Sequence, residues 1–159
     1  MIVAGKYCGN DGEDDVLQLA HKAGLSDRVV LPGFLGPADM IGLLSGSDVV
    51  TSPSLDVPFN AAAFPTKIAE YAGIGCCIVA TRVGDIPVYF QDNYNARLVV
   101  PDSPESMAAA FVELSASPEV RARLGASAAE TAKVNFDYQE HGRKLDEAIR
   151  DHLQHRRAA

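Results

Sequence analysis

Short apolar runs alternate with amphipathic stretches along the first two thirds of the chain. The runs lack polar alternation, which is typical of strands covered on both faces, and they lie at residues 2–4, 29–31, 49–51, 78–80 and 98–100. Stretches with helical spacing fall between them at residues 14–23, 38–45 and 66–72, and glycines at 24, 46, 73 and 75 provide stop signals. This repeated order predicts a parallel sheet of about five strands.

The last third of the chain has the pattern of helices only. Helices are predicted at residues 104–115, 118–135 and about 138–155, and Ser103-Pro104 and Ser117-Pro118 each place a capping hydroxyl before a first-turn proline. No repeat or linker divides the sequence, so we expect one domain over residues 1–155 and a frayed tail at 156–159. The predicted fold class is α/β: a Rossmann-like parallel sheet flanked by helices, with a helical C-terminal extension.

Composition and charge exclude several classes of protein. With 159 residues and a formal net charge of −7, the chain is not expected to bind nucleic acid broadly, so any bound phosphate must be held locally. The longest apolar run, residues 76–81, is far below the roughly 20 residues that cross a bilayer, and no secretory signal is visible, which predicts a cytoplasmic protein. Three cysteines and four histidines have neither a disulfide framework nor metal-ligand spacing, so we expect buried thiols and no metal.

Ligands of open parallel α/β sheets bind at the carboxyl ends of the strands, and the loop at residues 52–65 leaves a buried strand and enters a helix at Pro65 or Thr66. The free N–H groups and dipole of that helix suit a diphosphate. Lys67 and Glu70 lie on one face of it, where an ammonium can meet phosphate and a carboxylate can accept two ribose hydroxyls. An exposed ion pair between these two residues is the alternative interpretation, and spacing alone favours it.

Other candidate segments carry less chemistry. Residues 5–12 are glycine-rich after a strand but have neither dinucleotide nor P-loop spacing, and the acids at 11, 13, 14 and 15 are read as first-turn residues rather than cation ligands. Residues 32–36 offer bare backbone and an aromatic ring at a strand end, and residues 84–87 follow the next strand and can line the same crevice.

The order of these segments carries a resemblance. Residues 3–5, 24–34, 47–54, 84–87 and 97–101 stand in the same order as the motifs of a known family, and Phe64 to Thr81 contains its proline, lysine, Glu-Tyr, glycine and Val-Ala-Thr signature. The chain resembles the donor-binding half of GT-B glycosyltransferases, especially the large retaining family 4. The resemblance covers nearly all of the sequence and implies half of a GT-B fold.

The resemblance also implies roles for individual residues. Glu70 takes the ribose hydroxyls of a nucleotide-diphosphate sugar, and Lys67 stabilises the diphosphate leaving group. The remaining implied substrate contacts are Phe64, Pro65 and Thr66 at the diphosphate, Gly33 and Phe34 at the base, and Gly84 and Asp85 in the crevice. The expected activity is sugar transfer with retained anomeric configuration, with the donor as substrate and no cofactor.

The sequence departs from the family in two respects. Where the family commonly has a first glutamate, Ala62 stands here, and Asp56 is the nearest upstream acid that can substitute. The family's acceptor-binding domain, and the first strand and basic pair of the donor domain, do not precede Met1, so the first and third strands are expected to flank a gap.

These departures define the expected partners and the alternative function. A separate chain or the acceptor domain is the implied partner, and we expect the fragment alone not to turn over. The complete enzyme can be peripheral to the inner face of the membrane, and an exposed strand edge favours a homo-oligomer. A catalytically silent nucleotide-binding or interaction module is the alternative function.

Overall fold

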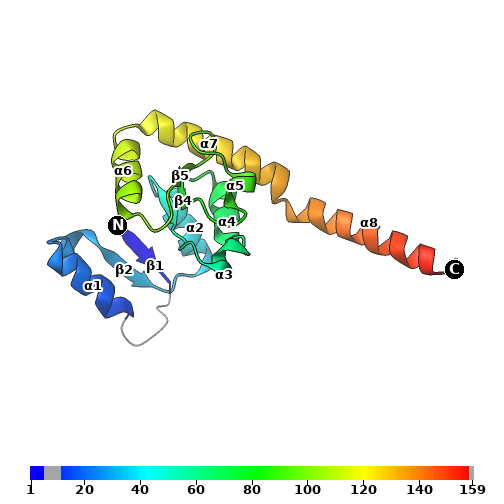
Figure 1. Ribbon diagram of the computed structural model, residues 1–159, viewed down its shortest axis with the longest axis horizontal. Coiled ribbons are helices and arrows are strands. Elements are labelled where there is room, and N and C mark those ends of the chain that lie inside the picture. The colour runs from blue at the N-terminus through cyan, green and yellow to red at the C-terminus, as the bar shows by residue number, and fades with distance from the viewer. Residues whose placement is uncertain (6–11, 158–159) are drawn as a thin grey trace. The chain divides into compact units, whose positions relative to one another are not determined.

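The computed structural model describes residues 1–5 and 12–157, which form two compact units, residues 1–43 and 44–159 (Figure 1). The elements of the first unit are β1 (Ile2–Ala4), α1 (Gly12–Lys22), a 3-10 turn η1 (Ser26–Arg28) and β2 (Val30–Gly33). Helix α2 (Pro37–Ser45) leads from the first unit into the second. The prediction of a single domain over residues 1–155 stays a prediction.

The second unit holds three strands and most of the helices. Its elements are β3 (Val50–Ser52), α3 (Pro58–Ala61), α4 (Thr66–Ile74), β4 (Ile78–Thr81), α5 (Ile86–Tyr89), β5 (Arg97–Val99), α6 (Pro104–Ser115), α7 (Pro118–Asn135) and α8 (Tyr138–Arg157). Every predicted strand and helix is present to within a few residues. The sequence pattern missed the short elements η1, α3 and α5, because four residues or fewer carry no readable periodicity.

All strand pairs are parallel, which confirms the predicted fold class. Hydrogen bonds divide the five strands into a sheet of order β1-β2 and a sheet of order β3-β4-β5. Among the described residues, β1 pairs only with β2 and β3 pairs only with β4. The gap that the resemblance places between the first and third strands stays a prediction, because these strands belong to different units.

Burial of the strands differs between the two units. Strand β4 is buried at every residue, as a central strand covered on both faces must be. In the first unit Ile2 is 50% exposed and Val30 is 53% exposed, so the prediction that all five strands are covered on both faces is wrong for β1 and β2. A unit of 43 residues is too small to enclose a sheet on both sides.

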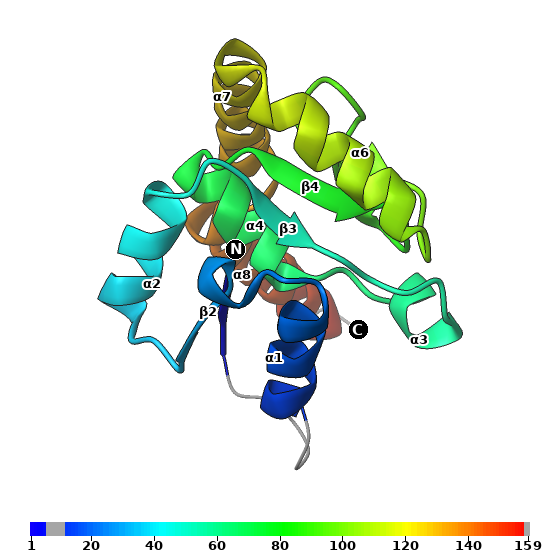
Figure 2. The same ribbon diagram turned by 90° about the vertical axis from the view of Figure 1, so that its left-hand side faces the viewer.

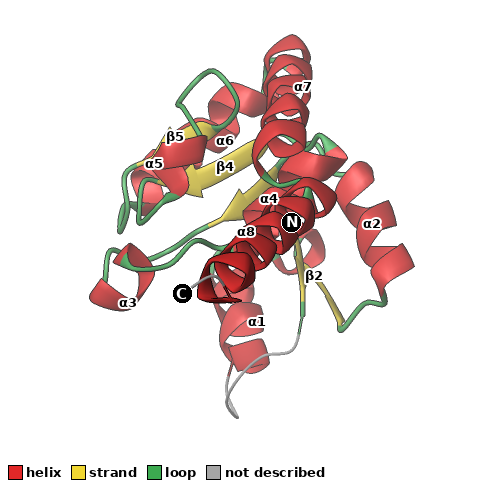
Figure 3. Cartoon of the chain, turned by 90° about the vertical axis from the view of Figure 1, so that its right-hand side faces the viewer, coloured by secondary structure: helices red, strands yellow, loops and turns green. Residues whose placement is uncertain are grey.

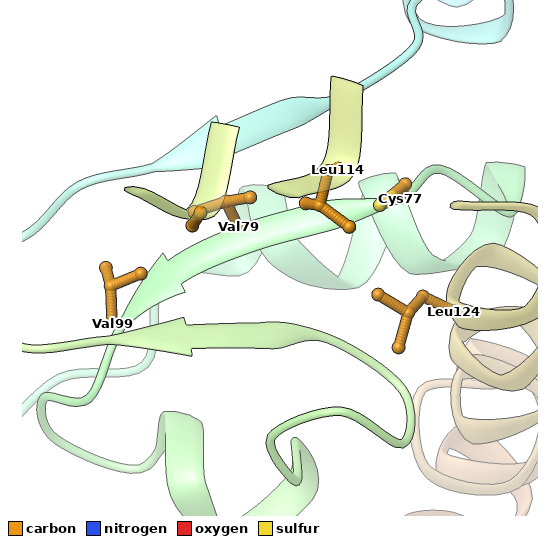
Figure 4. Close-up of a cluster of buried hydrophobic side chains, with 6 residues drawn as sticks. Cys77, Val79, Val99, Leu114 and Leu124 are labelled. Carbon is orange, nitrogen blue, oxygen red and sulfur yellow. The ribbon is translucent and has the colours of Figure 1, made fainter. Parts of the chain in front are cut away.

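Helices α4 and α6 lie on opposite sides of the three-stranded sheet, and α7 crosses its end (Figures 2 and 3). One core cluster contains six buried residues from β4 and the position just before it, β5, α6 and α7 (Figure 4): Cys77, Val79, Val99, Ala110, Leu114 and Leu124. Alternation along β4 directs its other residues toward α4, where Ile68 and Ala72 are fully buried. The sheet of this unit is thus fixed from both faces.

Two glycines allow α4 and α7 to approach closely. Gly75 ends α4 in the left-handed conformation at φ 83°, which glycine adopts without strain. Gly125 of α7 lies against it so closely that a β-carbon at Gly125 would overlap the carbonyl oxygen of Gly75. The C-terminal end of α4 is fixed there, which leaves its N-terminal end facing the loops after β3 and β4.

The helix starts agree with the sequence at one serine and differ at the other. Ser103 Oγ accepts a hydrogen bond from the Ser106 N–H at 3.1 Å, so the predicted cap of α6 is confirmed. Ser117 occupies the N-cap position of α7 without a side-chain hydrogen bond, so that predicted cap is wrong; its ψ of 77° departs from the extended values that typical caps adopt. Asp137, which the sequence analysis did not single out, accepts from the Gln139 N–H at 2.8 Å at the start of α8.

Candidate functional site

A cavity of about 290 Å³ lies where the loops after β3 and β4 meet the start of α4. It is lined by Ser54, Phe59, Asn60, Ala63, Phe64, Pro65, Thr66, Val83 and Ile86. The cavity therefore lies beyond the carboxyl ends of two neighbouring parallel strands, where ligands of such sheets bind. Three predicted substrate residues, Phe64 to Thr66, share its wall. Ser54 and Asn60 also line the cavity, and the sequence pattern of the loop at residues 52–65 does not predict a role for either residue.

Two hydrogen bonds shape the loop that forms the cavity wall. Thr81, at the end of β4, is buried, and its hydroxyl accepts a hydrogen bond from the Ser54 N–H at 2.8 Å. Asn60 Nδ2 donates to the Leu55 carbonyl at 2.9 Å, which closes the loop before α3. The loop after β3 is thereby held by the end of β4, which fixes the part of the cavity wall that follows β3 to the part that follows β4.

Gly84 supports the cavity from behind. Its φ is 56°, and a β-carbon built on it would lie 2.5 Å from the Ala63 carbonyl oxygen and 2.6 Å from the Asn60 carbonyl oxygen. Both neighbours are backbone atoms, which cannot swing aside as a flexible side chain can. Gly84 does not itself line the cavity, whereas Val83 and Ile86 beside it do. The structure therefore gives this predicted substrate residue a supporting position.

The N-terminus of α4 lacks a side-chain cap among the described residues. Pro65 is the N-cap and makes no side-chain hydrogen bond, and the first turn contains no acidic residue. Helix α6 differs, since the Ser103 side chain caps it and Glu105 lies in its first turn. Because Pro65 and Thr66 line the cavity, the unsatisfied helix end borders it and favours an anion there.

Lys67 and Glu70 are exposed on α4: Lys67 directly follows Thr66 of the cavity wall, and Glu70 lies about one turn further along the helix. The ion pair that spacing alone favours is not formed: among the described residues neither side chain enters a salt bridge, although Lys133 and Glu130, at the same spacing on α7, pair at 2.6 Å. Glu70 still acts electrostatically on its neighbour, because burial and then the Glu70 charge raise the pKa of Tyr71. Both charges on α4 are thus available to a ligand.

An aromatic cluster connects the cavity wall to the end of α7. The Phe64 ring lies 5.3 Å from Tyr89 and 5.4 Å from Phe136 between centroids, and Tyr89 lies 5.1 Å from Phe136. Phe136 is the C-cap of α7, and its N–H donates to the Ala132 carbonyl at 2.8 Å. These contacts hold Phe64, and with it the entry into α4, against the α7–α8 junction.

The predicted base contacts belong to the first unit and are described within it. Gly33 ends β2 at φ 71°, and its carbonyl accepts a hydrogen bond from the Gly5 N–H at 2.8 Å. Phe34 follows with its side chain 73% exposed. Of the glycine-rich segment at residues 5–12 and the acids near it, residues 6–11 lie outside the described residues.

No acidic side chain of residues 1–5 and 12–157 lines the cavity. Ala62 is exposed at the end of α3. Asp56 is also exposed, does not line the cavity, and is held by its N–H, which donates to the Asp102 carboxylate at 3.4 Å. Neither Ala62 nor Asp56 lines the cavity, and the replacement of the absent acid by Asp56 stays a prediction. Asp85 is exposed at the N-cap of α5 and makes no capping hydrogen bond.

Three further features of the described chain concern metal binding, membrane crossing and a second cavity. In the part of the chain that the structure describes, no group of three or more histidine, cysteine or acidic residues is arranged to hold a metal ion. No helix within the described ranges combines the length and hydrophobicity needed to cross a membrane. A more open cavity of about 600 Å³ lies between α5 and α7, where buried Asn95 donates to the Tyr89 carbonyl and to Thr131 Oγ1. Its lining includes Pro87 of the segment at residues 84–87 but none of the residues predicted to contact the donor or to stabilise the leaving group.

Comparisons with known proteins extend these observations. The sequence profile of the family described as glycosyl transferases group 1 matches residues 1–131. A D-inositol 3-phosphate glycosyltransferase of Saccharomonospora viridis is 31% identical over 135 residues, covering 84% of this chain and 30% of that protein. The chain thus spans about 30% of the length of the curated relatives it matches.

Solved structures share the fold. A glycosyltransferase from Rickettsia africae matches with a TM-score of 0.84 at 21% identity, over 96% of this chain and 39% of that one. HepE from Anabaena, solved with UDP-glucose, matches with a TM-score of 0.83 at 22% identity, over 94% of this chain and 40% of that one. At these identities the likeness concerns the fold, and it confirms the predicted α/β architecture.

Proposed function

Because the chain belongs to the glycosyl transferases group 1 family, we propose that it is the donor-binding part of a glycosyltransferase and binds a nucleotide-diphosphate sugar at the start of α4. The observation that carries this proposal is the 290 Å³ cavity bordered by a helix N-terminus without a side-chain cap, followed by Lys67 and Glu70, neither of which forms a salt bridge among the described residues. The relatives are named as glycosyltransferases, and HepE was solved with UDP-glucose.

The diphosphate lies against the Phe64 to Thr66 backbone. The first N–H groups of α4 donate to its oxygens, and the Lys67 ammonium adds a mobile positive charge. Glu70, four residues beyond Thr66, lies on the same face of the helix and accepts hydrogen bonds from the two ribose hydroxyls. The assignment of Gly33 and Phe34, in the first unit, to the base stays a prediction from the resemblance.

Sugar transfer by the complete enzyme is part of the proposal. As the bond between the anomeric carbon and the diphosphate breaks, negative charge grows on the leaving diphosphate, and the helix end and Lys67 stabilise that charge. No carboxylate of the described residues lines the cavity, so this part of the protein contributes leaving-group stabilisation rather than a base at the sugar. An acceptor-binding domain or chain supplies the other wall of the cleft.

Titration calorimetry with UDP, GDP, ADP and their sugars tests the binding. We expect the wild-type chain to bind at least one of these nucleotides and Glu70→Ala to weaken that binding by roughly ten-fold or more, as the loss of charge-assisted hydrogen bonds requires. Glu130→Ala, on an exposed face of α7, is the matched control and should leave the dissociation constant unchanged. Wild-type protein that binds none of these nucleotides would refute the proposal.

The second candidate function is the silent interaction module. This function is favoured because no acidic side chain of the described residues lines the cavity. Ala62 stands where the family commonly has a glutamate, and Asp56 lies outside the cavity lining. The two functions differ once the complete cleft is supplied. Transfer above a Glu70→Ala control, with an acceptor domain added, supports the enzyme; nucleotide binding without transfer in that assay supports the module.

A further inference from the structure

The cavity of about 600 Å³ between α5 and α7 is built on a hydrogen-bonded floor. Asn95 lines it and is only 3% exposed, and its Nδ2 donates to the Tyr89 carbonyl at 3.0 Å and to Thr131 Oγ1 at 2.7 Å. Asn95 Oδ1 accepts a hydrogen bond from the Gln91 N–H at 2.7 Å. This one buried side chain joins α5, the loop that follows it and α7. The cavity is therefore preformed, as small-molecule sites usually are.

Three side chains of the lining keep their hydrogen-bonding groups for a ligand. Arg82, Gln91 and Tyr94 are exposed, and within residues 1–5 and 12–157 none of the three side chains forms a hydrogen bond or an ion pair. A guanidinium offers five donors, a carboxamide offers donors and an acceptor, and a phenol hydroxyl offers one of each. The Tyr94 ring is 57% exposed, so it presents an apolar face beside these polar groups. Adjacent hydroxyls on a ring with an apolar C–H face, as in a saccharide, match this combination.

The charge of the lining selects an anion. Asp92 is the acid among the lining residues, and Arg97 Nη1 bonds both of its carboxylate oxygens, at 3.0 and 2.9 Å. The Leu98 N–H adds a third hydrogen bond to the same carboxylate at 2.8 Å. Asp92 is thus neutralised by its own partners, and Arg82 stays as a cation without a counter-charge among the described residues.

One guanidinium matches one carboxylate best. The planar fork of arginine binds the two oxygens of a carboxylate through parallel hydrogen bonds. A dianionic phosphate would bring a second negative charge beside Asp92, in a chain whose net charge is already −7. The lining therefore favours a singly charged acid over a phosphate ester.

We propose that this cavity binds a saccharide that carries a carboxylate, a uronic acid residue. Arg82 binds the carboxylate, Gln91 bonds the ring hydroxyls, and the Tyr94 ring lies against the C–H face of the sugar. The site is separate from the proposed donor cavity, because α5 lies between them: Ile86 lines the donor cavity, and Pro87 to Tyr89 line this one. A nucleotide and a uronic acid can therefore be bound together.

Titration calorimetry of the 159-residue chain with glucuronate tests the proposal, with glucose, acetate and inorganic phosphate as comparison ligands. We expect glucuronate to bind at least ten-fold more tightly than each of them. Arg82→Ala should weaken glucuronate binding by roughly ten-fold or more, because a charge-assisted hydrogen-bond pair is lost. Arg150→Ala removes the same charge from an exposed position on α8 and should leave the dissociation constant unchanged. Absence of glucuronate binding, equal affinity for glucose or phosphate, or an unaltered Arg82→Ala chain overturns the proposal.

Two further measurements locate the site and separate it from the donor cavity. Tyr94→Ala should weaken glucuronate binding and Tyr94→Phe should largely keep it, since phenylalanine retains the ring; equal losses in both variants would contradict stacking. Glucuronate should shift the amide resonances of Gln91, Tyr94 and Asn95, in the wild type with saturating UDP as well as in Glu70→Ala. Because Glu70→Ala affects only the donor site, nucleotide binding can fail while this site stands. Displacement of glucuronate by UDP, or shifts centred on Thr66, would overturn a separate site.

Discussion

Replacement of Gly84 by alanine should damage both the stability of the second unit and its cavity. The added β-carbon lies 2.5 Å from the Ala63 oxygen and 2.6 Å from the Asn60 oxygen, whereas ordinary contacts begin near 3.4 Å. The backbone at residues 60–63 must therefore move outward by most of an ångström. Asn60, Ala63 and Phe64 form the cavity wall, so this displacement reaches the proposed diphosphate site.

The expected cost has two parts. A side chain at φ 56° costs roughly 1–2 kcal/mol, and overpacking against backbone costs roughly 1–3 kcal/mol more, so we expect a loss of about 2–5 kcal/mol. Gly75→Ala isolates the first part, because Gly75 has φ 83° with its nearest neighbour at an ordinary 3.8 Å. Gly73→Ala isolates helix propensity: nothing lies within 4 Å of its β-carbon position, so it should stabilise α4 by up to about 1 kcal/mol.

Urea unfolding followed by near-ultraviolet tyrosine circular dichroism measures these differences, since four of the five tyrosines lie in residues 44–159. We expect the order of stability to be Gly73→Ala, wild type, Gly75→Ala and then Gly84→Ala. Nucleotide affinity, measured where each variant is fully folded, should fall only for Gly84→Ala. Equal losses for Gly84→Ala and Gly75→Ala would refute the close approach of Gly84 to the loop.

Three further perturbations test other parts of the structure. Leu124→Ala should cost about 2–5 kcal/mol in urea unfolding because the side chain is fully buried, whereas Val112→Ala, at a 70% exposed position, should change stability by less than about 0.5 kcal/mol. Phe136→Ala should weaken nucleotide binding in calorimetry because Phe64 loses its support, Phe136→Leu should largely restore it, and equal affinities for both would contradict the coupling. Burial raises the pKa of Cys77 from its ordinary 9.0 to about 11, so the folded state holds this proton more tightly. The contribution of the protonated Cys77 thiol to the free energy of unfolding is fully present below pH 9 and is lost as the pH rises toward 11. Urea unfolding at several pH values should therefore show a smaller loss of stability over this range for Cys77→Ala than for the wild type.

The long elements could be predicted from the sequence because each follows a strong local rule. Strand β4 is an uninterrupted apolar run, and α6 begins at a serine followed by proline, so both were located closely. The exposure of β1 and β2 was not predictable in this way. An apolar run indicates that a strand favours burial, but it does not show whether other elements cover the strand. The missing cap at Ser117 depends on backbone angles that the residue type does not determine.

The site was predictable where it lies within one segment. Residues 64–66 and the helix they open were identified from the loop that precedes them, and the structure places them at a cavity. Contacts between distant segments were not predictable. Three such contacts depend on tertiary packing, for which a single sequence has no local signal. They join Thr81 to Ser54, Gly84 to Ala63 and Phe136 to Phe64.

Amide chemical shifts recorded while the chain is titrated with a nucleotide-diphosphate sugar test the central claim most directly. The account predicts the largest shifts at Thr66, Lys67 and Glu70, and their loss in Glu70→Ala protein that keeps its other resonances. Shifts centred instead on Asn95 and Thr131, in the cavity between α5 and α7, or none at saturating ligand, would contradict it.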